Sequence, residues 1–229
     1  MGKLAGLLLA FFFLTQSALA ASPPIGQAPS DTSKPAESPV VSLQRVIDIL
    51  ESQARDLRQG LVNLSGLKDG QKQRRQAYLM FLDGALDYYE SLQVNDDGSN
   101  VKVIANEIKS RRQNNYQAEI RKISDFVLVY QAMNILRTAE KRFTRIDSDL
   151  ERLIGLAILK AGKPEIILND AHASLAAADS LMNQAETLLD ARAKNETLRF
   201  LISDAIKNIR QAYKDFFAIS HFVAANTNK

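Results

Sequence analysis

Apolar residues recur along most of this chain at alternating spacings of three and four positions, with no sustained two-residue alternation. This spacing places apolar side chains on one face of a helix, whereas strands show a period of two. One apolar stripe occupies residues 43–64 and a second occupies residues 78–92, with turn-forming Gly66 and Asp69-Gly70 between them. The pattern therefore predicts a helical hairpin in this part of the chain.

A third helix is predicted to begin near Val101, after a loop of Asn, Asp, Gly and Ser residues at positions 95–100. If it continued to Ala161, it would be about 90 Å long at 1.5 Å per residue. Its early and late apolar stripes are out of phase, and residues 126–130 are all apolar, which is typical of a helix buried on every side. We therefore expect this helix to pass from one packing layer to the next, and the polar stretch 111–115 is where a break would fall.

Two further helices follow Gly162-Lys163-Pro164, because glycine suits a helix end and proline suits a first helical turn. Their apolar stripes cover residues 168–189 and 198–223, with a turn near Lys194-Asn195. Alanine recurs in the stripe 168–189, and such small side chains let helices approach closely. Together with the late part of the third helix, these stripes predict an antiparallel three-helix coiled-coil bundle.

The fold class predicted is all-α: an antiparallel helical bundle of about five helices with coiled-coil-like seams. One long central helix is shared by an N-terminal helical hairpin layer, residues 41–130, and a C-terminal three-helix bundle, residues 131–225.

Five of the six prolines fall between Pro23 and Pro39, among Ser, Ala, Gly and Gln residues. Residues 21–40 are therefore predicted to be a disordered linker before the helical domain 41–229.

The first twenty residues have the three parts of a secretory signal peptide. Lys3 supplies a positive charge, Leu4 to Leu14 form an apolar run, and Ala18-Leu19-Ala20 has the small residues of a cleavage site. A run of 11 residues is short for a membrane span, which needs about 20 apolar residues. We expect cleavage after Ala20 and a secreted or periplasmic protein; the alternative is an uncleaved membrane anchor.

Composition narrows the chemistry available to the chain. The formal net charge is only +3, which argues against nucleic-acid binding, where a dense basic field is expected. The absence of cysteine excludes disulfides, thiolate catalysis and thiolate metal sites, and for an exported protein it suggests a bacterial source. The core alone must then stabilise the fold, and a chain of this length can bury enough surface to do so.

No catalytic, cofactor-binding or metal-ligating set emerges from the sequence. The two histidines, His172 and His221, lie beside the apolar stripes and are expected on the surface. The Asp96-Asp97-Gly98 loop does not fit a calcium hand, because Gln93 and Ile104 would occupy its first and twelfth positions. We therefore expect a protein that is not an enzyme and that needs no cofactor.

Basic residues cluster in the predicted second and third helices. If these helices are antiparallel neighbours, Arg74 and Arg75 would lie near Arg111 and Arg112 and form a patch for an anionic partner. A lipid headgroup, a cell-wall polymer or a nucleic acid would each fit such a patch. However, residues 68–122 contain ten basic and eight acidic residues, which favours an ordinary solvated helix surface.

The late part of the chain carries a recognisable order of short motifs. These are Arg145-Ile146, Leu150-Glu151-Arg152-Leu153, Gly162 at a helix end, Ile167-Leu168-Asn169-Asp170-Ala171, Leu175 and Ala178 in a leucine–alanine repeat, and a closing helix through Ile206 to Phe217. This segment, residues 138–220, resembles uncharacterised exported helical-bundle proteins of candidate-phyla (ultra-small) bacteria. The resemblance implies a helical bundle in a bacterial envelope and brings no functional residues.

Two functions fit these features. The first is a non-enzymatic exported scaffold or interaction protein of the cell envelope or extracellular space, with an unknown protein or envelope partner and self-association through its helix seams. It would contact a membrane only if the signal segment were retained. The alternative is an extracytoplasmic, sensor-like bundle that binds a ligand. Its pocket would be lined by aromatic residues: Tyr78, Phe81, Tyr88, Tyr89, Tyr116, Phe126 and Tyr130.

Overall fold

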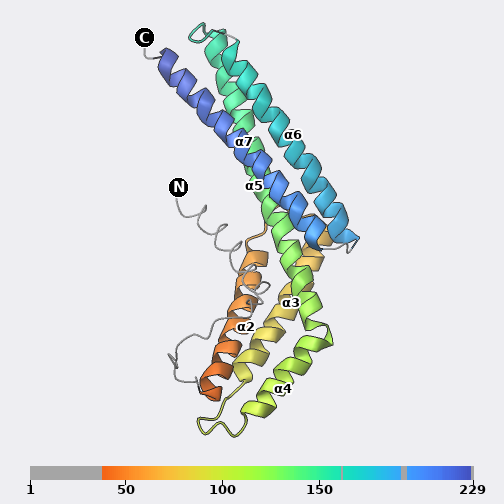
Figure 1. Cartoon of the computed structure of the whole chain (residues 1–229). Coiled ribbons are helices and arrows are strands. Elements are labelled where there is room, and N and C mark those ends of the chain that lie inside the picture. Colours follow the sequence, from red (N-terminus) through yellow and green to blue (C-terminus); the bar gives the residue numbers. More distant parts are fainter. Residues whose placement is uncertain (1–37, 161, 192–194, 228–229) are drawn as a thin grey trace, which may run out of the picture. The chain divides into compact units, whose positions relative to one another are not determined.

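The computed structural model describes residues 38–160, 162–191 and 195–227, which belong to one compact unit. Every regular element in these ranges is helical, so the predicted all-α bundle is confirmed (Figure 1). The predicted signal peptide, residues 1–20, and most of the predicted linker, residues 21–40, lie outside the described residues. The elements are α2 (Pro39–Val62), α3 (Asp69–Ser91), α4 (Val101–Arg111), the π-helical turn η1 (Arg112–Tyr116), α5 (Gln117–Gly155), α6 (Lys163–Asp190) and α7 (Asn195–Thr227).

Helices α2 and α3 form the predicted hairpin. Helix α2 starts at Pro39, two residues earlier than expected, because proline is well placed in a first helical turn. The chain turns at Gly66, whose φ of 67° suits glycine. The assignment of Asp69-Gly70 to this turn was wrong: both residues begin α3, where the Gln71 side chain accepts a hydrogen bond from the Lys68 backbone N–H at 2.7 Å. The Gln71 oxygen thus satisfies one of the free donors of the first turn.

The long third helix is broken where the polar stretch predicted a break. Asn114 (φ −82°, ψ 68°) and Asn115 (φ 64°, ψ −11°) leave the helical conformation between α4 and α5. Asparagine is among the few residues that enter the left-handed region readily, since its short polar side chain can bond locally. We call α4, η1 and the first turns of α5 the elbow, residues 101–122.

The far end of α5 also differs from expectation, since the helix stops at Gly155 instead of reaching Ala161. Ala157 was expected on the apolar seam, but it adopts a φ of 55° and is exposed. The tighter turn brings Leu159 into a small apolar cluster with Leu150 and Leu168. Leu159 is thus buried by this turn, while its neighbours Leu156 and Ile158 are 64% and 47% exposed.

Helix α5 passes through two hydrophobic cores, as the five consecutive apolar residues predicted. Phe126 and Tyr130 are buried against α2 and α3, whereas Val129 and Ala132 are buried against α6 and α7. In Figure 1, α5 runs from the layer of α2, α3 and α4 into the bundle that it forms with α6 and α7. Its sequence must therefore be apolar on opposite faces at the crossing.

The antiparallel pair α6 and α7 completes the C-terminal bundle. The α6 alanines Ala171, Ala178 and Ala185 are fully buried, and so are Ala205 and Ala212 of α7. Small side chains at these positions let the helix axes approach closely. The predicted leucine–alanine seams are therefore the contact surfaces of this bundle.

A polar contact joins the two layers where α3 meets α6. The Glu186 carboxylate accepts hydrogen bonds from the Gln71 amide at 2.7 Å and from the Tyr130 hydroxyl at 2.9 Å. Nearby, Arg74 donates to Asp190 at 2.7 Å. Burial, with the Glu186 carboxylate beside it, raises the pKa of Tyr130. Because hydrogen bonds are directional, this cluster specifies how the α2–α3 hairpin sits on the bundle.

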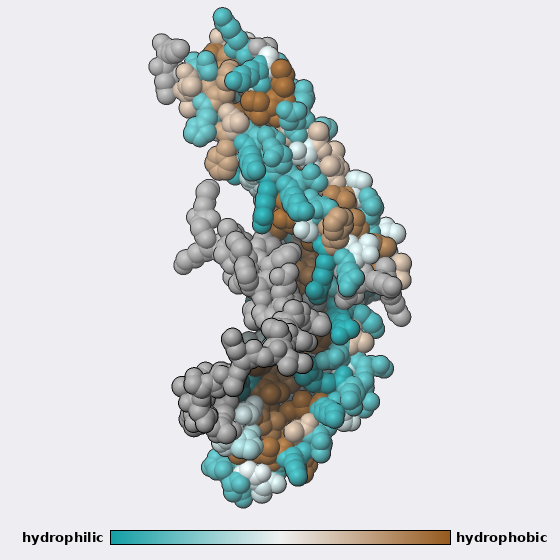
Figure 2. Space-filling model, viewed as in Figure 1, coloured by the Kyte–Doolittle hydropathy of each residue, from teal (hydrophilic) through white to brown (hydrophobic). Residues whose placement is uncertain are grey.

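Surface hydropathy is uneven over these helices. On the face drawn in Figure 2, apolar surface gathers where α2, α3 and α4 lie, beside hydrophilic surface. Several large apolar side chains are exposed on α2, including Val46 and Ile49, which are 40% and 59% exposed. Within the described ranges, none of the helices is both long enough and apolar enough for a membrane span.

Candidate anion-binding groove

A surface groove of about 590 Å³ lies between the start of α2 and the elbow. Residues from α2, α4, η1 and α5 contribute to it, so the break in the long helix shapes its wall. We call it the cationic groove, after the charges on its rim. It is lined by Leu43, Val46, Ala105, Ile108, Lys109, Arg112, Gln113, Asn115, Gln117, Ala118 and Arg121.

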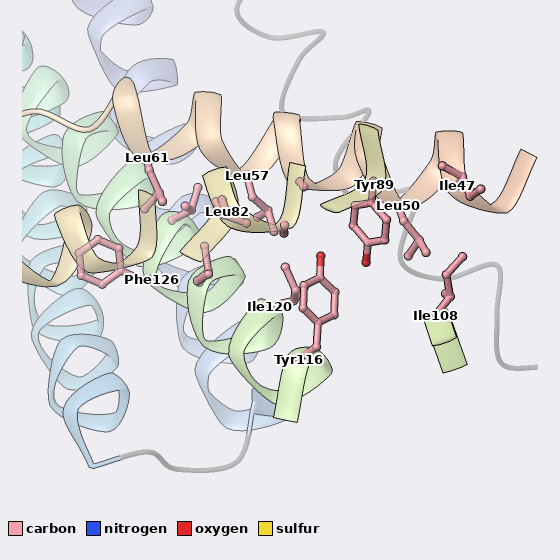
Figure 3. Packing of buried hydrophobic residues seen from close by; sticks show 14 of the residues in the cluster. Ile47, Leu50, Leu57, Leu61, Leu82, Tyr89, Ile108, Tyr116, Ile120 and Phe126 are labelled. Carbon is pink, nitrogen blue, oxygen red and sulfur yellow. The ribbon is translucent and has the colours of Figure 1, made fainter. Parts of the chain in front are cut away.

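The floor of the cationic groove is aliphatic. Leu43 and Ile108 are buried and belong to the first hydrophobic core, while Val46, Ala105 and Ala118 are open to solvent. Figure 3 shows Ile47 and Leu50 of α2 facing Ile108 of α4, and all three residues belong to the first core. The floor is therefore anchored on well-packed helices and is not formed by a loop.

The rim of the groove is cationic. Lys109, Arg112 and Arg121 line it, and no acidic residue among those that the structure describes does so. Within the described part of the chain, no ion pair involves any of these three side chains. The elbow carries six basic and two acidic residues, and one of the acidic pair, Glu119, is already bonded to Lys122 at 2.7 Å. The elbow therefore has an excess of positive charge that could attract an anion.

The elbow brings residues from both of its arms to one groove. Lys109 precedes the two non-helical asparagines and Arg121 follows them, yet both line the groove. Arg112 lies 2.7 Å from the Gln117 side-chain amide when the amide oxygen faces the guanidinium, a contact between η1 and α5. In a continuous helix, residues 109 and 121 would point about 120° apart after three full turns at 100° per residue, and would therefore lie on different faces.

The four arginines predicted as a patch do not come together. Arg74 pairs with Asp190, and Arg75 donates to the Leu64 carbonyl at 3.2 Å. Arg111 contacts α3 farther along, since its guanidinium covers the Tyr88 ring at 4.0 Å and donates to the Gly84 carbonyl at 3.3 Å.

Along α3, Gly84 lies ten residues beyond Arg74, which is about 15 Å at the helical rise. Arg111 therefore sits beside the second half of α3, and Arg74 and Arg75 sit near its first turns. The short α4 and the elbow explain this separation, because α4 ends before it could reach the start of α3. Of the four, only Arg112 lines the cationic groove.

The aromatic residues proposed for a ligand pocket do not line the groove either; they pack against one another in the first core. Phe81 stacks on Tyr116 at 5.5 Å, and Tyr78 meets the edge of Phe126 at 5.3 Å. Figure 3 shows Tyr89 and Tyr116 pointing towards each other, and burial together with Tyr89 raises the pKa of Tyr116. Their role in this structure is packing.

Both histidines are exposed, as expected. The His172 ring lies 5.3 Å from the ring of Phe143, and His221 is near the end of α7. Among the residues described, there is no group of three or more His, Asp or Glu side chains that could hold a metal ion.

A second, smaller groove lies between the last turns of α5 and α7 and measures about 430 Å³. Its lining includes one acidic and one basic residue, Asp149 and Arg152, which approach each other to 3.8 Å. It therefore has no net charge to select a ligand, in contrast to the cationic groove.

These observations define an all-α helical bundle protein with a cationic groove at a helix elbow. No family model, no curated protein and no solved structure matches the chain.

Proposed function

We propose that the chain is a non-enzymatic exported binding protein, a helical scaffold of the bacterial cell envelope or extracellular space that holds an anionic partner in the cationic groove. One observation carries the proposal: Lys109, Arg112 and Arg121 surround an aliphatic floor, and none of the described residues that line the groove is acidic. Like charges placed together are unfavourable in an isolated protein, and an anion would relieve the repulsion.

Export is supported by the sequence of the first twenty residues, with Lys3, the apolar run from Leu4 and the Ala18-Leu19-Ala20 site. The scaffold part of the proposal is supported by α5, whose 39 residues are packed into both hydrophobic cores. Because α5 is packed into both cores, its first turns, which line the groove, are part of a rigid helix. The alternative proposal is a sensor-like bundle that binds a ligand; its ligand would lie in the cationic groove instead of an aromatic pocket.

The proposal can be tested by retention of the full-length protein on a sulfate-bearing polyanion resin. We expect Lys109→Glu/Arg121→Glu to elute at clearly lower salt than the wild type, because ionic contacts weaken with added salt. The matched control is Arg210→Glu/Lys214→Glu, which makes the same change of net charge at two exposed positions of α7. Equal elution of the two double variants would show that net charge alone, and not the groove, governs binding.

A further inference from the structure

We infer that the cationic groove binds a single-chain anionic lipid, with its acyl chain on the aliphatic floor and its carboxylate or phosphate head on the rim. The inference deepens the proposed function and rests on it. The argument depends on the side chains of the floor, on those of the rim, and on the size of the groove.

The floor suits an aliphatic chain. Its members are Leu, Val, Ile and Ala, and within the described ranges no aromatic residue lines the groove. Proteins that bind nucleic-acid bases use aromatic faces as stacking platforms, and this groove has none. Ile49, 59% exposed and one helical turn after Val46, extends the apolar face of α2 beyond the groove. Contact with a lipid chain would remove this exposed apolar surface from water.

The rim suits a compact anionic head. The guanidinium groups of Arg112 and Arg121 can each donate two parallel hydrogen bonds to a carboxylate or a phosphate, and Lys109 adds a point charge. The amides of Gln113 and Gln117 supply further donors beside them. Charge and donors therefore lie along one edge of an apolar floor, which is the division found in an anionic amphiphile.

The size of the groove favours one lipid molecule over a bilayer. Its volume of about 590 Å³ lies within the range of roughly 300–1,000 Å³ that holds small molecules. Leu43 and Ile108 at its base are 7% and 4% exposed, so a flat bilayer surface would touch the rim without covering the floor. A single chain can enter and cover both.

The test is calorimetric titration of the full-length protein with dodecanoate and with dodecyl phosphate, both below their micelle concentrations. We expect saturable binding of both, and the ratio of the two affinities shows which head the rim prefers. Dodecyl maltoside has the same chain and a neutral head, while acetate and inorganic phosphate have the head without the chain. All three controls should bind at least about tenfold more weakly, a difference near 1.4 kcal/mol.

Two variants separate floor from rim. Ala118→Phe fills the groove at an exposed position, so it should weaken dodecyl phosphate binding without lowering the thermal midpoint. Lys109→Glu/Arg121→Glu should weaken the same binding by about tenfold or more, since charge-assisted hydrogen bonds are lost. Arg210→Glu/Lys214→Glu, on α7, should bind as the wild type does.

Equal affinity for dodecyl maltoside and dodecyl phosphate would overturn the inference, and so would unchanged binding by Ala118→Phe. If the lipids fail to bind while the groove variant still loses retention on the polyanion resin, the proposed function stands and only the lipid assignment falls. If the groove variant also behaves as its matched control on the resin, both fall. Binding to anionic vesicles with none to monomeric lipid would replace the single lipid by a membrane surface and overturn the inference as stated.

Discussion

At the scale of single residues, Asp125 of α5 is a buried carboxyl group. Its side chain is 5% exposed, and its Oδ1 has no hydrogen-bond partner within the described residues. Burial raises its pKa to about 6, against the opposing effect of the Arg199 and Arg121 charges. A raised pKa means that the folded protein binds this proton more tightly than the unfolded chain does.

Asp125 therefore makes stability depend on pH in a defined direction. Its favourable contribution is complete below the unfolded pKa of 3.8 and is lost as the pH rises through about 6. We expect Asp125→Asn to be more stable than the wild type at pH 7.5, by roughly 1–2 kcal/mol after allowing for the two arginines, and the gain to vanish near pH 4. Urea unfolding followed by circular dichroism at both pH values measures this difference. Asp87→Asn, at an exposed position of α3, should show no such pH-dependent gain.

Two helical glycines are expected to respond in opposite ways to alanine. A Cβ at Gly84 of α3 would meet no atom within 4 Å, so Gly84→Ala should raise the free energy of unfolding by about 0.5–1 kcal/mol. A Cβ at Gly60 of α2 would lie 2.9 Å from Val127 Cγ1, where α2 crosses α5 closely. Gly60→Ala should therefore lose stability, by roughly 1–3 kcal/mol. Chemical denaturation of the pair measures both, and a gain at Gly60 would contradict the close approach.

At the scale of elements, the elbow between α4 and α5 is the feature on which the groove depends. Asn115 adopts a φ of 64°, which is costly for residues with a Cβ but is tolerated better by asparagine. The sequence showed that a polar stretch interrupts the apolar pattern here. It did not show the direction of the turn, because that direction follows from packing of Ile108 and Ile120 on the same core.

Asn115→Ala is expected to destabilise the protein by about 1 kcal/mol, since alanine pays the full cost of the left-handed conformation. Asn115→Gly should be neutral or slightly stabilising at the same position, because glycine adopts positive φ freely. The free energy of unfolding of the two variants tests this order. If alanine were as stable as glycine, the backbone at residue 115 would not be in the left-handed region.

At the scale of the molecule, α5 couples the two hydrophobic cores. Phe126 and Val129 are three residues apart on this helix, yet they belong to different cores, and both are fully buried. The hydrogen bonds of Glu186 to Gln71 and Tyr130 add a second connection. Loosening one core would therefore release the helix on which the other is built.

We expect the described helices to unfold in one cooperative transition. Leu82→Ala in the first core and Ile209→Ala in the second should each lower the free energy of unfolding by about 2–5 kcal/mol. Each variant should therefore shift the midpoint of the same single transition. Circular dichroism, which follows all helices, and tyrosine fluorescence, which is weighted to the first core, should give superimposable curves. Two separate transitions, each sensitive to one variant, would show that the cores are independent.

The helical seams were determined by the sequence alone, whereas the end of α5 at Gly155 and the start of α3 at Asp69 were not. Apolar spacing is a local property, so Leu168, Ala171 and Leu175 identify a buried face without reference to any partner helix. The same holds for the start of α6, where Gly162 has a φ of 120° and Pro164 lies in the first helical turn, because both depend on the φ that each residue allows. These signals are sufficient for the all-α class and for the crossing of α5 between layers.

The cationic groove was decided by the tertiary structure. Arg111 and Arg112 are neighbours in sequence, yet one covers Tyr88 and the other lines the groove. Charged side chains on helix surfaces carry no periodic signal that names their neighbours, and proximity between Lys109 and Arg121 requires the turn at Asn115. Local backbone preference and burial thus specify the helices, whereas the angle between α4 and α5 determines which charges share a surface.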